Sequence, residues 1–336
     1  MFLRRLTNTS LTCAIILASA ATGGAGPQPT RAERPLAGIR LAITVDDIPE
    51  HGDDLAGVTR EQITSAVVGA LKANAAPGVY GFANAYGLAA KPTEITIYEY
   101  WLQAGYPLGN HTYDHLNLDE VTAPAFNANI AKLDLLLDTL SPVSPLIEHR
   151  RVFRYPYLAE GDTLAKRDTV REYLKTNGYR IAEVTTDYND WAWNAAYVRC
   201  SRLHDAKSIE WLKERIIISA EETVKAESGL ALKLFGRNID QIVLTHDCAL
   251  EAVMLGKTLA RLRSDGVILI SLDEALRDSA YQINPNITTE GGRSFLKQIA
   301  ESRHMDNDAF DTTYTVEKLN AVCASVSANT PRQEQQ

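Results

Sequence analysis

Two short segments of the sequence contain side chains that could bind a metal ion. His111 and His115 are four residues apart, a spacing that lets two imidazoles project from one face of a helical turn toward one ion. Asp46 and Asp47 are adjacent, and either could add the oxygen ligand that a hard or borderline ion requires. Two imidazoles and one carboxylate leave an open coordination position, where a bound water becomes more acidic. Together the segments predict a hydrolytic metal centre.

Each segment alone also has an ordinary structural explanation. Adjacent acids after a strand commonly form a turn or cap a helix, and a pair of histidines is more often a surface or core feature than a ligand pair. The same holds for three further segments, which could be a surface arginine, an acidic loop with a packing tryptophan, and a histidine at the end of a strand. These segments are 154–157, 187–191 and 244–246.

The elements that must position these residues alternate along the chain. Short apolar runs predict strands, and the amphipathic stretches between them predict helices. The predicted strands are 39–45, 79–83, 108–111, 151–155, 181–185, 242–245 and 267–270, and the predicted helices are 59–73, 94–103, 125–140, 164–176, 209–227 and 252–264.

This alternation favours a parallel barrel or a doubly wound sheet over an antiparallel sandwich. In parallel α/β folds, sites are built at the carboxyl ends of the strands. All five polar segments follow apolar runs, so they are predicted to meet at that edge. Their shared placement favours the functional interpretation over five unrelated structural ones.

The five segments resemble the motifs of the polysaccharide deacetylase family, the carbohydrate esterases with NodB homology, over about residues 41–276. The family motif T-F-D-D corresponds to 44–47, with Val45 in place of the aromatic residue. The motifs H-[ST]-x-x-H and R-x-P-[FY] are intact. The remaining two motifs are an aspartate followed by tryptophan and L-x-H. In this sequence these four motifs are His111 to His115, Arg154 to Tyr157, Asp190-Trp191, and Leu244 to His246.

The resemblance implies an α/β fold, a distorted (β/α) barrel of about seven parallel strands, and the pattern after residue 280 predicts a small C-terminal helical extension. It implies that Asp47, His111 and His115 bind a divalent metal ion. Zinc is the first choice, and cobalt, nickel, manganese or iron would also suit these ligands. Asp46 corresponds to the catalytic base and His246 to the acid.

The resemblance also assigns supporting residues. Arg154 would orient Asp46, and Asp190 would tune His246. Trp191 and Leu244 resemble residues that enclose the acetyl methyl group. The remaining substrate-binding residues are Tyr155, whose backbone N–H would help form an oxyanion hole, and Tyr157.

The implied activity is removal of acetyl groups from an N- or O-acetylated carbohydrate through a metal-activated water. One alternative is a metal-dependent amidase of the same fold acting on a small C–N substrate. Another is a non-catalytic carbohydrate-binding barrel. An insertion at 187–241 departs from the family pattern and contains Trp193, Tyr197 and Trp211, which favour a sugar-binding surface.

Composition sets limits on partners. The chain has 336 residues, a formal net charge of -8 and 45% hydrophobic residues. An acidic chain does not favour nucleic acid or anionic membrane as its main partner, because both select basic surfaces. The composition leaves the oligomeric state open.

The N-terminus resembles a secretory signal. Arg4 and Arg5 precede a short apolar stretch at 11–21, which is shorter than the ~20 residues a membrane-spanning helix needs. We therefore expect a secreted or periplasmic protein with no stable membrane insertion after cleavage; a retained N-terminal anchor is the alternative. The predicted parts are 1–26, the signal peptide and linker start; 36–280, the barrel; and 281–336, the C-terminal extension, with helices at 292–303 and 316–325.

Cleavage of the signal would remove Cys13. Cys200, Cys248 and Cys323 would remain, so at most one disulfide could form within the chain. The sequence leaves the pairing open.

Overall fold

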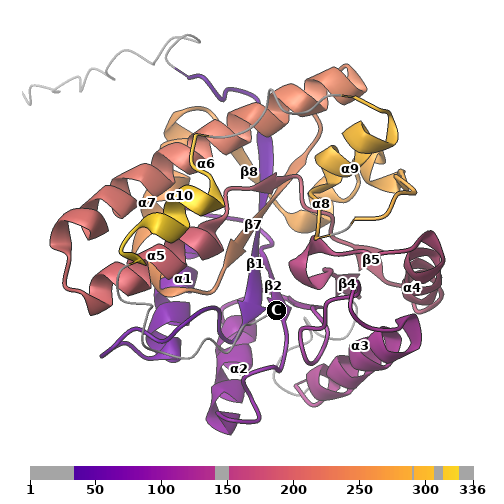
Figure 1. The fold of residues 1–336 in the computed structure, drawn as a ribbon, viewed down its shortest axis with the longest axis horizontal. Coiled ribbons are helices and arrows are strands. Elements are labelled where there is room, and N and C mark those ends of the chain that lie inside the picture. Colours follow the sequence, from indigo (N-terminus) through magenta and orange to yellow (C-terminus); the bar gives the residue numbers. More distant parts are fainter. Residues whose placement is uncertain (1–33, 141–150, 290, 306–312, 325–336) are drawn as a thin grey trace, which may run out of the picture.

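The computed structural model describes residues 34–140, 151–289, 291–305 and 313–324 (Figure 1). The predicted signal peptide, at 1–26, lies outside these residues. Within the described ranges, every helix is too short or too polar to cross a membrane.

The centre of the fold is a parallel sheet, as the alternation of strands and helices predicts. Its order is β5-β4-β3-β2-β1-β7-β6, and β8 pairs with β1. The strands are β1 (Arg40–Ile48), β2 (Tyr80–Ala83), β3 (Leu108–Asn110), β4 (Val152–Phe153), β5 (Arg180–Ile181), β6 (Thr186–Asp187), β7 (Gln241–His246) and β8 (Ile268–Ile270).

The two ends of this sheet belong to one extended segment. The N–H of Ala182 donates to Phe153 O at 2.8 Å, so the first half of the segment pairs with β4, and the N–H of Thr185 donates to Ile242 O at 3.0 Å, so the second half follows β7. The sheet therefore curls into a distorted (β/α) barrel. The single strand predicted at 181–185 is instead two short strands, because the segment changes partner midway.

Helices cover the curled sheet (Figure 1). The predicted helix at 164–176 has the predicted bounds, whereas α5 was not predicted and α6 extends beyond the predicted 209–227 at both ends. The α-helices are α1 (Arg60–Ala73), α2 (Ile95–Gln103), α3 (Ala123–Asp138), α4 (Leu164–Thr176), α5 (Asp190–Arg202), α6 (Ala206–Phe235), α7 (Ala249–Ser264), α8 (Leu272–Ala275), α9 (Phe295–Ser302) and α10 (Val316–Ala321), and the 3₁₀ helices are η2 (Pro92–Glu94), η3 (Pro156–Leu158) and η4 (Ser279–Gln282).

Helix α1 shows why its sequence becomes a helix. Thr59 and Gln62 form both hydrogen bonds of a capping box, as their spacing predicts. Ile63, Val67 and Leu71 lie on one face and are buried in the core. The helix thus begins at a satisfied N-terminus and is held by its apolar face.

The aromatic residues of the insertion are largely structural. Trp193 is fully buried, with ring centroids 6.1 Å from Trp211 and 5.2 Å from Tyr314. This cluster joins α5 and α6 to the segment that precedes α10. Trp193 and Tyr197 are buried, so the expectation that they offer a sugar-binding surface is wrong for both.

The C-terminal extension packs on this insertion. Phe295 and Leu296 of α9 lie in one apolar cluster with Leu230 and Leu234 of α6. A disulfide between Cys200 and Cys323 joins α5 to the residues after α10, and Cys248 is a buried free thiol. The pairing that the sequence leaves open is therefore Cys200 with Cys323.

Candidate active site and metal centre

The two adjacent aspartates lie at the carboxyl end of β1. Asp46 pairs in register with His246 of the neighbouring strand β7. Consecutive strand residues normally point to opposite faces. The pairing of β1 with β2 is irregular between Val45 and Ile48, and Asp47 has a φ of 59°. Because this irregularity interrupts the alternation, both carboxylates can approach the same histidine, His111.

His111 and His115 follow β3 in a loop, so the prediction of a helical turn is wrong. Thr112 and His115 have φ values of 61° and 50°, outside the right-handed helical region. The side chain of Asn110 accepts a hydrogen bond from the Thr112 N–H, and that of Asn129 accepts one from the Asp114 N–H. This fixed loop places the two imidazole centroids 4.9 Å apart.

The three predicted ligands converge. Oδ1 of Asp47 lies 3.3 Å from Nε2 of His115 and 3.6 Å from Nε2 of His111. Donor atoms about 2.0–2.1 Å from a tetrahedrally coordinated ion are about 3.3–3.4 Å apart. The three side chains therefore fit one divalent ion, with only small adjustments.

Hydrogen bonding fixes the ligand orientation. The carbonyl oxygen of Arg154 lies 2.8 Å from Nδ1 of His111 and can accept its proton, which leaves Nε2 with a free lone pair. Burial lowers the pKa of His111 to about 3, so this imidazole is neutral at neutral pH. Burial raises the pKa of Asp47, but His115 and His51 outweigh it and hold that pKa well below its usual range. A carboxylate and a neutral imidazole are the protonation states that bind metal.

Asp46 has a different set of partners. Nη1 of Arg154 lies 3.3 and 3.2 Å from the two carboxylate oxygens of Asp46, the contact that the resemblance implies. The buried Arg154 is itself held by Ala182 O at 2.6 Å and Thr44 Oγ1 at 3.1 Å. Burial raises the pKa of Asp46 to about 7, although Arg154 acts in the opposite direction. A carboxylate with a pKa in this range is suited to exchange a proton at neutral pH.

His246 is bound by Asp190. Oδ1 of Asp190 lies 2.7 Å from Nδ1 of His246, and Oδ2 accepts the backbone N–H of His246 at the same distance. Burial lowers the pKa of His246, but Asp190 more than reverses this effect and raises it to about 10. His246 is thus protonated at neutral pH and can donate a proton from Nε2.

The predicted substrate-binding residues differ in placement. Tyr157 is 47% exposed, and its ring centroid lies 4.5 Å from that of His115. Trp191, in the first turn of α5, is 37% exposed. Leu244 is buried in β7, between Thr44 and Asp187 of the neighbouring strands. Tyr157 and Trp191 are therefore accessible to a ligand.

Tyr155 is placed differently, because its ring is buried and lies 4.9 Å from that of Phe153. Among the described residues, no hydrogen-bond acceptor is found for its backbone N–H. Because the ring of Tyr155 is buried, its backbone N–H is the part of this residue that could serve the predicted oxyanion hole.

Two residues of the site were missed by the sequence analysis. Nδ1 of His51 lies 2.7 Å from Oδ2 of Asp47, and its ring centroid is 4.1 Å from that of His246. Nδ2 of Asn84 donates to Oδ1 of Asp47 at 2.7 Å. Asn84 directly follows β2, so the rule that sites lie at the carboxyl ends of strands could have found it.

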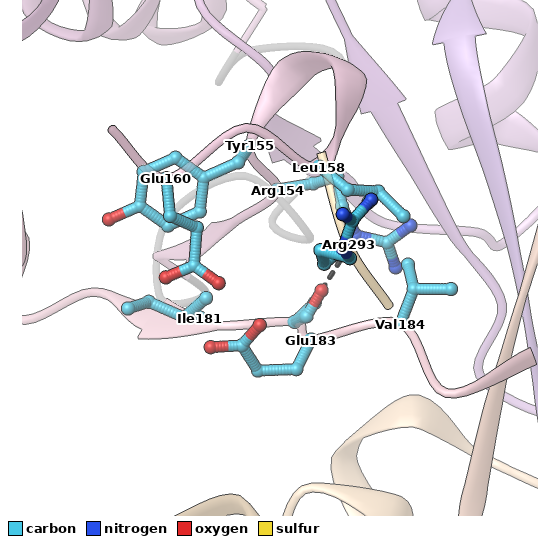
Figure 2. A pocket seen from close by; sticks show the side chains of 9 residues that line it. Arg154, Tyr155, Leu158, Glu160, Ile181, Glu183, Val184 and Arg293 are labelled. Carbon is cyan, nitrogen blue, oxygen red and sulfur yellow. Dashed lines mark hydrogen bonds between the residues drawn. The ribbon is translucent and has the colours of Figure 1, made fainter. Parts of the chain in front are cut away.

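A small pocket lies against another part of Arg154 (Figure 2). None of the three predicted metal ligands lines it, so we do not assign it as the reaction site. Its lining residues are Arg154, Tyr155, Leu158, Glu160, Ile181, Ala182, Glu183, Val184 and Arg293.

Comparison with known proteins agrees with the motifs. The model of the polysaccharide deacetylase family matches residues 34–182, a region that includes β1 to β5. No curated protein matches the chain.

Several solved structures are similar at low sequence identity. BA3943 of Bacillus anthracis is a pseudoenzyme of carbohydrate esterase family 4, and one of its mutants has restored activity. The structure of this mutant has a TM-score of 0.47 and 15% sequence identity, and the match covers 72% of this chain and 68% of that one. The chitin deacetylase of Colletotrichum lindemuthianum has a TM-score of 0.46 and 20% sequence identity, and the match covers 71% of this chain and 88% of the deacetylase. A family 4 carbohydrate esterase of Streptomyces lividans has a TM-score of 0.45 and 18% sequence identity, and the match covers 71% of this chain and 96% of the esterase.

Proposed function

Because residues 34–182 belong to the polysaccharide deacetylase family, we propose that the chain is a metal-dependent hydrolase that removes acetyl groups from an N- or O-acetylated carbohydrate. The observation that carries this proposal is the convergence of Asp47, His111 and His115, with Asp46 and His246 beside them. A non-catalytic barrel would not need the base and the acid, and both are present.

A divalent ion held by the three ligands would lower the pKa of a bound water and polarise the acyl carbonyl. Asp46 then accepts a proton from the attacking water. Arg154 orients the Asp46 oxygens for this step, and Asp47 would be left to bind the ion. His246 donates a proton from Nε2 to the departing amine or alcohol, while Asp190 holds Nδ1.

The acyl group would lie between these proton-transfer residues. The Tyr155 N–H would donate to the acyl oxygen as negative charge develops there. Trp191 and Leu244 would enclose the methyl group, and the exposed ring of Tyr157 beside His115 would contact the sugar.

We also propose that the protein acts outside the cytoplasm. The Cys200–Cys323 disulfide supports this, because disulfides persist in oxidising compartments. The basic and apolar N-terminus supports it independently.

The test is acetate release from chitooligosaccharides, peptidoglycan fragments and acetylated xylan. Protein stripped of metal should be inactive, and one equivalent of zinc, cobalt, nickel, manganese or iron should restore release. The small amides formamide and acetamide are tested in parallel by ammonia release, because formamide yields formate instead of acetate. Acetate release that survives complete chelation, or turnover of the small amides alone, would contradict the proposal.

A further inference from the structure

His51 is fixed in position although it lies outside the family motifs. Its backbone N–H donates to Asp247 O at 3.2 Å, and Nη1 of Arg60 donates to its carbonyl oxygen at 2.9 Å. These bonds hold the residue between two parts of the site. Its Nδ1 meets Asp47, and its ring lies against that of His246.

The two oxygens of Asp47 face different partners. Oδ1 meets His111, His115 and Asn84, whereas Oδ2 meets Nδ1 of His51 at 2.7 Å. An ion held through Oδ1 would therefore leave Oδ2 directed at a second imidazole. A carboxylate placed in this way can bridge two ions.

His246 completes a second set of donors. One donor atom from each of Asp47, His51 and His246 lies within 4.8 Å of the other two. Asp190 engages Nδ1 of His246, so Nε2 is the nitrogen available to a ligand. A carboxylate behind a metal-bound histidine is a common arrangement that fixes the ring and strengthens the ligand.

We propose that Asp47, His51 and His246 form a second divalent-cation site that shares Asp47 with the first. Two imidazoles and a carboxylate suit zinc, cobalt, nickel and related ions. The pair of sites resembles two-metal centres in general, whose ions lie about 3.5–4 Å apart. The second site is expected to be the weaker one, because Asp47 already faces two imidazoles and Asn84 through Oδ1.

Occupation of the second site has a consequence for catalysis, which rests on the proposed function. Nε2 of His246 cannot both bind an ion and deliver a proton to the leaving group. Excess metal should therefore inhibit the enzyme after the first equivalent has activated it. The binding of a second ion does not depend on that function.

The test of binding is a titration of the metal-free protein. Cobalt is followed by visible absorption, zinc by calorimetry, and bound ions are counted by native mass spectrometry. The wild type should bind two ions in separate steps. His51→Gln should bind one, because glutamine retains a donor to Asp47 but is a poor metal ligand.

The matched control is His204→Asn. His204 is an exposed histidine with a φ of 56°, a conformation that asparagine accepts. This variant should bind two ions like the wild type. A wild type that binds a single ion at every concentration, or a His51→Gln protein that still binds two, would overturn the proposal.

The kinetic arm uses the acetylated substrate with the fastest turnover. Wild-type activity should rise with the first equivalent of zinc and fall as the second binds. In His51→Gln the zinc concentration that inhibits should rise by at least about 100-fold. Loss of a group that only supports a metal ligand costs 10- to 100-fold in metal affinity, and His51 is proposed as a ligand itself. Full activity with two ions bound would refute the inhibitory role. Failure of all acetylated substrates would refute the proposed function, and the ion count would still decide the second site.

Discussion

At the residue scale, the two adjacent aspartates differ in what holds them. Asp46 is bound by a buried guanidinium and lies beside His246 across the strand pair. Asp47 is bound by Asn84 and His51, and its Oδ1 faces the two ligand histidines. This difference supports the proposal that Asp46 transfers a proton and that Asp47 binds the ion.

Replacing Asp46 by asparagine tests this separation. Turnover should fall at least about 100-fold, since a positioned base typically contributes 10²- to 10⁴-fold. The first metal equivalent should still bind, because Asp47, His111 and His115 are unchanged. Steady-state kinetics and metal analysis on the same preparation measure both. Full activity of the metal-loaded variant would show that Asp46 is not the base.

Replacing His111 by alanine should have the opposite pattern. This variant should lose both activity and the first ion, because one of three ligand atoms is removed. Metal affinity is read by competition with a chromogenic chelator, and His204→Asn is the control. Retention of the first ion with wild-type affinity would remove His111 from the ligand set.

The sequence predicted that Asp47, His111 and His115 lie together, as the structure shows, but it did not predict their local backbone geometry. Residue type and order indicated Asp47, His111 and His115, but the spacing of the histidines suggested a helical turn, and the structure has a loop with two left-handed residues. Periodicity cannot reveal such backbone conformations. His51 and Asn84 were missed because neither belongs to the motifs.

At the element scale, the segment 180–187 joins the two ends of the sheet. Between β5 and β6 it carries Glu183, a buried carboxylate that accepts a hydrogen bond from Arg171 at 3.2 Å. Burial raises the pKa of Glu183 to about 7, and the nearby Glu160 acts in the same direction. An ionised Glu183 is therefore costly in the folded state.

This shift predicts a pH-dependent effect of Glu183→Gln. A raised carboxyl pKa adds stability that is complete below the unfolded value of about 4.3 and is lost as pH rises through about 7. The free energy of unfolding of the variant, minus that of the wild type, should therefore increase by on the order of 1–3 kcal/mol from pH 5 to pH 8. Urea unfolding across this range measures it, with the exposed Glu172→Gln as the control. A difference that is constant with pH would contradict the assigned cause.

Elements were predicted well where they carry local patterns. Helix α1 has its capping box and apolar face, and α4 has the predicted bounds. Helix α5 was missed, because the chemistry of Asp190 and Trp191 suggested a loop where the structure has the first turn of a helix. The division into β5 and β6 depends on which strands pair, and a local pattern does not contain that information.

At the scale of the whole molecule, the insertion and the C-terminal extension stabilise one another. Trp193, Trp211 and Tyr314 pack together, and the Cys200–Cys323 disulfide lies between α5 and the end of α10. The extension is thus part of the packed fold, which its polar composition did not indicate.

Removal of this disulfide should lower stability. The bond joins residues 123 positions apart, and closing a loop of this size stabilises by about 2–5 kcal/mol. Cys200→Ser combined with Cys323→Ser should lower the denaturant midpoint accordingly. A reducing agent should reproduce the loss in the wild type and leave the double variant unchanged. Equal midpoints for oxidised wild type and double variant would show that packing alone holds the extension.

The register of β1 with β7 has one more consequence. Asp46 and His246 are carried by adjacent strands and held by backbone ladders, whereas two of the three predicted ion-binding side chains lie in the loop after β3. Substitutions in that loop are therefore expected to weaken ion binding while Asp46 and His246 keep their spacing. Loss of the ion should thus leave the Asp46–His246 pair in place, because the backbone of β1 and β7 holds it.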